Sequence, residues 1–170
     1  KLCDVDYGQG VSTDKAPSAV ASGGSYNAVV NFMYSVRIED GRILPEVTNL
    51  NDYAGIRGKR ITDIAIRCDK GSLWYQVHIL GGDWLPKVSG CDWMEPENGF
   101  AGDNKVIDAV RVYYNTPHDI VSSQGYQQAQ YRTSQINLGY GNWQYDDETR
   151  NGQNGFTGSF GKAIDRFQLF

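Results

Sequence analysis

A short series of motifs recurs along the chain, and this recurrence constrains the fold more than any other feature of the sequence. In its second occurrence the series reads Tyr75-Gln76-Val77-His78, Gly82-Asp83-Trp84-Leu85-Pro86, Asn98-Gly99-Phe100-Ala101-Gly102 and Ile107-Asp108-Ala109-Val110. The leading tyrosines, Tyr34, Tyr75 and Tyr131, lie 41 and 56 residues apart. Most of the chain therefore consists of three diverged copies of one unit of about 45 residues.

The copies occupy about residues 32–71, 72–115 and 129–170, and we expect them to form a single domain over residues 30–170. A single copy is too short to bury its own apolar face, so the three must share a core. Residues 1–29 precede the repeats and contain a stretch of small residues, which predicts an N-terminal arm or linker. A polar insertion at residues 116–130 separates the second copy from the third.

Each copy contains short alternating or β-branched runs, such as 64–66 and 110–114, separated by Gly, Asn and Asp. None of them carries the 3.6-residue apolar period of a helix. The sequence predicts an all-β protein, a pseudo-threefold β-trefoil of three repeats, with a β-prism as the alternative.

The charge balance argues against a nucleic-acid partner. The formal net charge is -4, whereas phosphate binding depends on clustered Lys and Arg. No apolar run approaches the roughly 20 residues that cross a bilayer, so we expect no membrane partner. Three cysteines, Cys3, Cys68 and Cys91, fit either one disulfide with a leftover thiol or three thiols.

The sequence contains no strong motif of catalytic residues. His78 and His118 are the only histidines, and neither accompanies a nucleophile motif. The run Asp146-Asp147-Glu148 could supply paired carboxylates or bind calcium, but it reads more simply as a solvated loop. We therefore expect no enzyme and no cofactor, with calcium the one metal to test.

Asp63, Asp108 and Asp165 each stand just before the final strand of their copy. They would either bind a ligand or accept backbone N–H hydrogen bonds at a turn, and we favour the second interpretation. The rings of Tyr53, Phe100 and Phe156 are expected to be buried.

Trp84 and Trp143 occupy the same position in the second and third copies, where the first copy has Ile43. A sugar ring packs on an aromatic face while amides and carboxylates bind its hydroxyls, so these tryptophans suit a glycan site equally well as they suit a core. Trp93 and Tyr145 stand in polar loops and are expected to be exposed. The candidate ligand-binding residues are Asp83, Trp84, Trp93, Asn98, Asn142, Trp143, Tyr145, Asp146 and Asn154.

The series from Tyr75 to Val110 resembles the C-terminal repeats of modular cell-wall hydrolases, such as muramidases and amidases, of clostridia and related Gram-positive bacteria. The resemblance covers about 140 residues of the chain. It implies a non-catalytic module that targets a cell-wall glycan, in a secreted protein with a covalently linked catalytic domain.

From these features we expect a secreted module that binds a polysaccharide or the glycan of peptidoglycan, with sites repeated among the copies. The alternative is a protein-interaction domain, either an inhibitor or an exosite seated on a companion catalytic domain.

Overall fold

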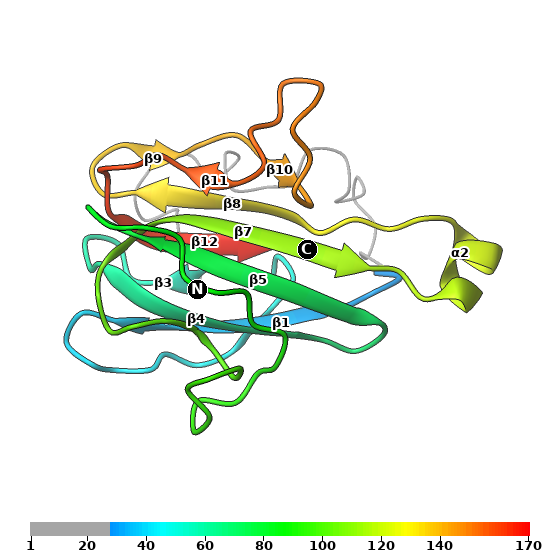
Figure 1. Cartoon of the computed structure of the whole chain (residues 1–170), viewed down its shortest axis with the longest axis horizontal. Helices are drawn as coiled ribbons and strands as arrows, with labels where there is room; N and C mark the ends of the chain where they lie inside the picture. Colours follow the sequence, from blue (N-terminus) through cyan, green and yellow to red (C-terminus); the bar gives the residue numbers. More distant parts are fainter. Residues whose placement is uncertain (1–27) are drawn as a thin grey trace.

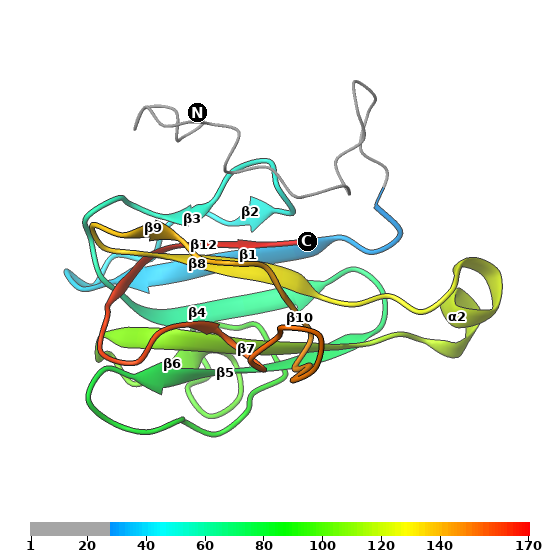
Figure 2. The ribbon, with the colours of Figure 1, turned by 90° about the horizontal axis from the view of Figure 1, so that it is seen from above.

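Within residues 28–170, the part of the chain that this computed structural model describes, each copy is built around one long antiparallel strand pair. The pairs are β1 (Phe32–Ile38) with β4 (Ile61–Cys68), β5 (Ser72–Ile79) with β7 (Ile107–Asn115), and β8 (Gln130–Gln135) with β12 (Ile164–Leu169). All six strands run along the long axis of the molecule (Figures 1 and 2). The all-β prediction is confirmed, and the strands of each copy fall inside the expected repeat bounds.

Short strands link the copies to one another. They are β2 (Val47–Thr48), β3 (Ala54–Gly55), β6 (Ala101–Gly102), β9 (Gly139–Tyr140), β10 (Gln144–Tyr145) and β11 (Thr157–Gly158). Three of them join the last strand of the preceding copy: β6 pairs with β4, β11 with β7, and β3 with β12. The last of these pairs connects the third copy back to the first, so the exchange runs in a closed ring through three separate sheets.

The insertion between the second and third copies contains a helix that the sequence did not indicate. This helix, α2 (His118–Gln124), projects at one end of the molecule (Figure 1). Only Ile120 is buried in it, and that side chain joins the core. No helix in residues 28–170 has the length and apolar composition that a membrane span requires.

The expected N-terminal arm, residues 1–29, lies almost entirely outside the described residues. Val29, its last residue, packs against the core next to the buried Val30. The apolar core therefore extends slightly before the first repeat.

The three leading tyrosines form equivalent buried hydrogen bonds. Each hydroxyl donates to a backbone carbonyl 15 residues further along its own copy, from Tyr34 to Asn49 at 2.6 Å, from Tyr75 to Gly90 at 2.6 Å, and from Tyr131 to Asp146 at 2.7 Å. Each hydroxyl is also hydrogen-bonded to the backbone of the preceding copy, at Leu169, Ile66 and Val112 respectively. Burial raises the pKa of all three phenols, so they remain neutral donors.

Carboxylates form a second set of contacts between copies. Each accepts a backbone N–H from the next copy, Asp63 from Asn104 at 3.2 Å, Asp108 from Gly161 at 2.7 Å, and Asp165 from Gly58 at 2.8 Å. All three are at most 1% exposed. The expected turn-capping role is therefore confirmed, but it acts between copies.

The sequence suggested that the three aspartates occupy equivalent positions, but their strand registers differ. Asp63 itself pairs with the glycine of β6, whereas Ala109 and Arg166, the residues that follow Asp108 and Asp165, pair with β11 and β3. Thr62 takes the equivalent position in the first copy and donates to the Asp63 carboxylate at 2.6 Å.

The exchanged short strands approach their partners so closely that only glycine fits. Gly55, Gly102 and Gly158 have φ values of +126°, +144° and +109°. A Cβ atom at Gly55 would overlap the carbonyl oxygen of Asp165, and one at Gly158 would overlap that of Asp108. Left-handed geometry and close approach together require glycine at these positions.

We expect Gly55→Ala to lower the free energy of unfolding by about 3 kcal/mol, because the methyl group would separate β3 from β12 and open the ring. Urea denaturation measures this loss.

Gly152→Ala is the matched control. Gly152 also has a positive φ, +83°, but no atom lies within 4 Å of its added Cβ, so only backbone strain of about 1 kcal/mol is expected. Equal losses in the two variants would contradict the close-approach argument.

Candidate functional site

One cavity in the third copy gathers three of the candidate residues. Asn142, Trp143 and Asn154 line a hollow of about 230 Å³ that Gln135 and Phe156 also border. Asn142 and Trp143 lie just before β10, and Asn154 lies just before β11. The loop between these two strands therefore brings residues 12 positions apart in the chain onto one surface.

Two glutamines, the buried Gln144 and the half-buried Gln153, hold this loop in place. Gln144 is 3% exposed; its amide nitrogen donates to the carbonyl of Glu148 at 2.8 Å, and its oxygen accepts the N–H of Asn154 at 3.2 Å. Gln153 accepts the N–H of Tyr145 at 2.7 Å and donates to the carbonyl of Trp143 at 3.2 Å. The backbone around the cavity is thus fixed before any ligand arrives.

The side chains that face a ligand remain available. The amide groups of Asn142 and Asn154 are exposed and make no hydrogen bond to another residue in 28–170. Trp143 is half-buried, with Phe170 packed edge-on at 5.3 Å and the Arg132 guanidinium 4.5 Å from its ring centre. We define Asn142, Trp143 and Asn154 as the third-copy pocket.

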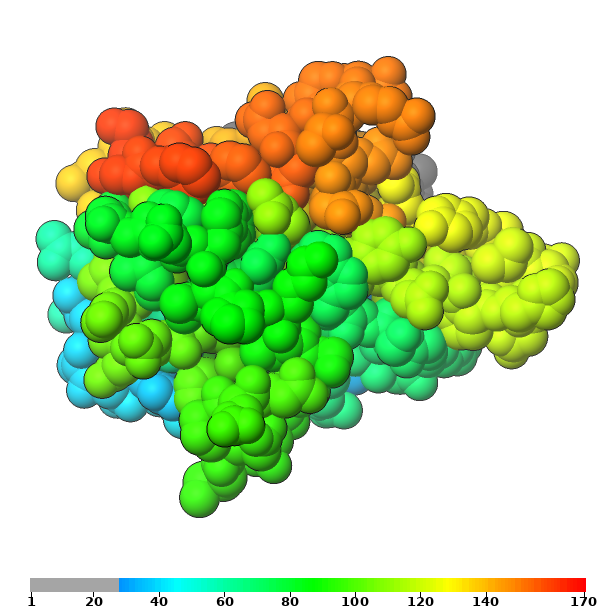
Figure 3. All heavy atoms as spheres, in the orientation of Figure 1, coloured from blue at the N-terminus to red at the C-terminus, as the bar shows by residue number. Residues whose placement is uncertain are grey.

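Trp84 lies at the junction between the second and third copies, in an aromatic cluster. The Arg111 guanidinium sits 4.2 Å from its ring centre, and Phe156 packs edge-on at 5.5 Å. Phe160, which is 55% exposed, stacks on Phe156 at 5.3 Å. Figure 3 shows the orange and red atoms of the third copy lying directly against the green atoms of the second. Because Phe156 also borders the third-copy pocket, the two aromatic surfaces are continuous.

His78 belongs to this junction between the second and third copies. Its Nδ1 atom lies 2.6 Å from the buried Asp108 carboxylate, whose second oxygen accepts the N–H of Gly161. The imidazole ring also stacks on Phe160 at 4.0 Å. These contacts place His78 in the packing between copies.

Asp83, the neighbour of Trp84, is exposed in the turn after β5. Its carbonyl accepts the N–H of Ile79 at 3.0 Å, which closes the turn. Asp83 is therefore exposed to solvent next to Trp84 of the aromatic cluster.

Trp93 and Asn98 belong to a different loop, and the expectation that Trp93 is exposed is wrong. The Trp93 indole N–H donates to Ser35 at 3.0 Å, and its ring lies 5.1 Å from both Phe100 and the Arg37 guanidinium. Asn98 is exposed, but its side chain is bonded to Ser89. Both residues stabilise the loop and its junction with the first copy.

The three rings expected to be buried, Tyr53, Phe100 and Phe156, each lie close to an arginine side chain. Tyr53 and Phe100 are each 9% exposed, whereas Phe156 is only half-buried. Each ring packs near an arginine, at centroid distances of 5.6 Å for Arg166 and Tyr53, 5.0 Å for Arg37 and Phe100, and 5.8 Å for Arg111 and Phe156.

Asp146 is a structural residue, so its assignment as a ligand-binding carboxylate is wrong. It is 2% exposed, and its Oδ1 atom accepts the N–H groups of Tyr114 and Ala129 at 3.0 and 2.9 Å. Burial raises its pKa to about 6, although these two N–H groups oppose the rise. The adjacent Tyr145 is half-buried and does not line the pocket, so the expectation that it is exposed is also wrong.

The acidic run therefore does not converge on a shared site. Asp146 points inward, Asp147 is exposed, and Glu148 accepts a hydrogen bond from Gln128 at 2.7 Å. Among residues 28–170, no group of three or more His, Cys, Asp or Glu side chains is placed to hold a metal ion.

The described cysteines are not bonded to each other. Cys68 and Cys91 are free, half-buried thiols, and burial raises the pKa of both. Cys3 lies outside the described residues.

The first copy has a wider groove where the third has its pocket. Its walls include Leu44, Pro45 and Tyr53, and its volume is about 910 Å³. The described residues that line this groove include no tryptophan.

Comparison of the chain with protein-family models, with curated proteins and with solved structures finds no match in any of the three. The function must therefore be argued from the geometry itself.

Replacing Asp146 by asparagine tests its structural role. The folded-state pKa of about 6 exceeds the ordinary value of 3.8, so the stability that this carboxyl contributes is complete below pH 4 and is lost as the pH rises through 6. An asparagine accepts the same N–H groups without a charge, as Asn49 does for Phe32 at the equivalent position of the first copy. We expect Asp146→Asn to raise the free energy of unfolding at pH 8 by about 2 kcal/mol.

Urea denaturation at pH 5 and pH 8 measures this effect, with the exposed Asp83→Asn as the control. A loss of stability in Asp146→Asn at both pH values would show that the carboxylate is needed in its charged form.

Proposed function

We propose that this chain is a secreted, non-catalytic module that binds a carbohydrate, with the third-copy pocket as its main sugar site. The observation that carries the proposal is the combination of one half-buried indole with two exposed amides that have no partner in residues 28–170, beside a loop fixed by Gln144 and Gln153. Sugar C–H faces pack on aromatic rings, and amides exchange two hydrogen bonds with neighbouring hydroxyls.

The size and composition of the pocket support a small polar ligand. A volume of about 230 Å³ suits one sugar ring rather than an extended chain, and threonine and glutamine side chains complete the wall. The exposed Phe160 and the half-buried Trp84 extend the apolar surface from Phe156 toward a second ring.

For the architecture we infer a pseudo-threefold arrangement of the three repeats. The division of the strands into three sheets, each completed by a short strand from the next copy, supports the β-prism over the β-trefoil. A trefoil would close its long strands into one barrel.

The resemblance to wall-hydrolase repeats supports peptidoglycan or another wall polysaccharide as the natural partner, with catalysis left to a linked domain. The buried uses of His78 and Asp146 are consistent with an accessory role, because both side chains are engaged in packing. Nucleic acid and membranes remain excluded from the proposal by the net charge of -4 and by the chain's polarity.

A protein-interaction role is the second candidate, and one feature favours it. Met94 is 87% exposed in the loop of the second copy that ends at Asn98. A flexible thioether on a projecting loop suits contact with another protein, such as a companion catalytic domain.

We expect the protein to sediment with Gram-positive cell walls and to bind their solubilised glycan in a calorimetric titration. Asn154→Ala should weaken binding about fivefold, because it removes hydrogen bonds of roughly 1 kcal/mol. Trp143→Ala should weaken it at least about tenfold through the lost ring contact.

Thermal unfolding separates binding from folding in these variants. Asn154→Ala should leave the melting temperature unchanged, and Asn115→Ala, an exposed asparagine outside the pocket, should change neither property. If the unmodified protein showed no binding on a glycan array and no change in tryptophan fluorescence on titration with glycans, the protein-interaction role would be favoured instead.

A further inference from the structure

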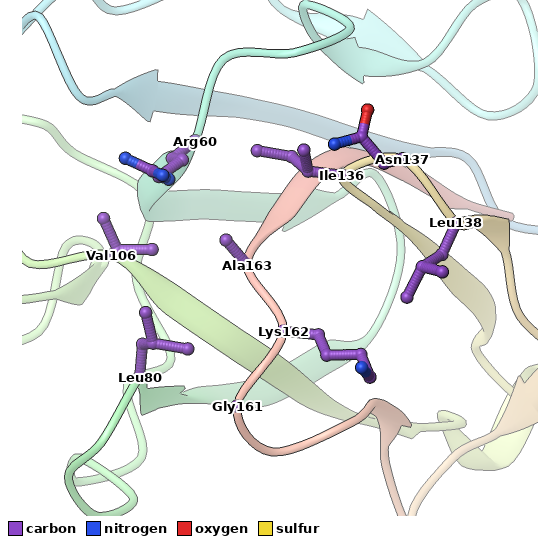
Figure 4. A pocket seen from close by; sticks show the side chains of 9 residues that line it. All are labelled: Arg60, Leu80, Val106, Ile136, Asn137, Leu138, Gly161, Lys162 and Ala163. Carbon is purple, nitrogen blue, oxygen red and sulfur yellow. The ribbon is translucent and has the colours of Figure 1, made fainter.

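A second cavity opens at the end of the long strands opposite to α2. Its volume is about 600 Å³, and Figure 4 shows its walls coming from all three copies. We call it the hairpin-end cup, and it is lined by Arg60, Leu80, Val106, Ile136, Asn137, Leu138, Gly161, Lys162 and Ala163. None of these residues belongs to the third-copy pocket.

The position of the cup follows from the repeat. Arg60, Val106 and Ala163 each precede the isoleucine that opens the last strand of a copy, and these isoleucines, Ile61, Ile107 and Ile164, are fully buried. The cup therefore rests on the end of the shared core.

The walls of the cup present apolar surface to solvent. Leu80 is 37% exposed and Leu138 is 61% exposed, two of only seven large apolar side chains that are exposed in residues 28–170. Figure 4 places Leu138, Val106 and Ala163 around the same opening. Exposed apolar side chains gathered in a concave site favour an aliphatic ligand group.

The charged groups of the cup are both cationic. Lys162 forms no ion pair within residues 28–170, and the Arg60 guanidinium lies 3.5 Å from Glu39, with both side chains exposed. An exposed pair at that distance contributes little, so Arg60 can exchange Glu39 for a ligand carboxylate. In a chain of net charge -4, this local excess of positive charge selects an anion.

The cup and the third-copy pocket are lined by neighbouring residues of the third copy. Gln135 lines the pocket and Ile136 lines the cup. The Gln135 amide donates to the carbonyls of Ser159 at 3.2 Å and Lys162 at 3.0 Å, which fixes the loop between the two cavities. These hydrogen bonds hold together the segments that border the two cavities.

We propose that the hairpin-end cup binds a short acidic peptide with small aliphatic side chains, its carboxylates held by Arg60 and Lys162 and its methyl groups packed on Leu80 and Leu138. This inference rests on the proposed sugar site. The ligand that fits both cavities is a glycan that carries such a peptide. The third-copy pocket takes the sugar, and the cup takes the peptide arm.

The test measures calorimetric binding of the full chain to two separate probes. One is a short peptide of alternating alanine and glutamate with a free carboxyl terminus, and the other is an N-acetylated amino-sugar oligomer. We expect the peptide to bind, and its amidated analogue with glutamine in place of glutamate to bind at least about fivefold more weakly.

Variants locate the peptide site. Arg60→Gln with Lys162→Gln should weaken peptide binding about fivefold or more, and Leu138→Ala about threefold. Lys70→Gln with Lys87→Gln, two exposed lysines outside the cup, should leave it unchanged, as should Asn154→Ala in the pocket.

The outcomes separate the two proposals. Peptide binding without sugar binding would contradict the proposed sugar site and support the peptide site in the cup. Sugar binding without peptide binding would contradict the peptide site. Equal peptide affinity in the unmodified protein and in the Arg60/Lys162 variant would also overturn it. Concentration-dependent self-association that this variant abolishes would assign the cup to a second copy of the chain instead.

Discussion

The contact on which the rest of the structure depends is the junction where one copy accepts a short strand from the next. A buried carboxylate receives a turn N–H across each junction, and a glycine without a Cβ lets the two backbones meet. The junction between Asp165 and Gly58 connects the end of the chain to its first copy. Since no copy can bury its apolar face alone, closing this ring is what creates a core.

The junctions also explain where function can develop. The positions that the copies share, namely the tyrosine hydroxyls, the carboxylates and the glycines, are engaged in contacts between copies. Loops outside these positions are free to differ, and they do: the third copy has a narrow polar pocket, the second an aromatic cluster, and the first an open groove. A repeated scaffold thus carries three unequal surfaces.

Much of the scaffold could be predicted from sequence, because repeated tyrosine, glycine and aspartate positions carry their spacing with them. Asn142, Trp143 and Asn154 were selected because their residue types match sugar chemistry, and all three line one cavity, but their role as a sugar site stays a prediction. Asp146 and Trp93 were misassigned because their partners are distant: Trp93 bonds to a residue 58 positions away, and neighbouring acids give no sign of which one turns inward. The hairpin-end cup was missed because its walls come from three copies.

We propose that one of the three repeat copies, the third, binds the glycan. Amide chemical-shift mapping of the isotopically labelled protein with solubilised cell-wall glycan tests it most directly. We expect the largest shifts to cluster at Asn142, Trp143 and Asn154, while the residues of the groove at Leu44 do not shift. Shifts spread equally over the three copies, or confined to the loop around Met94, would contradict it.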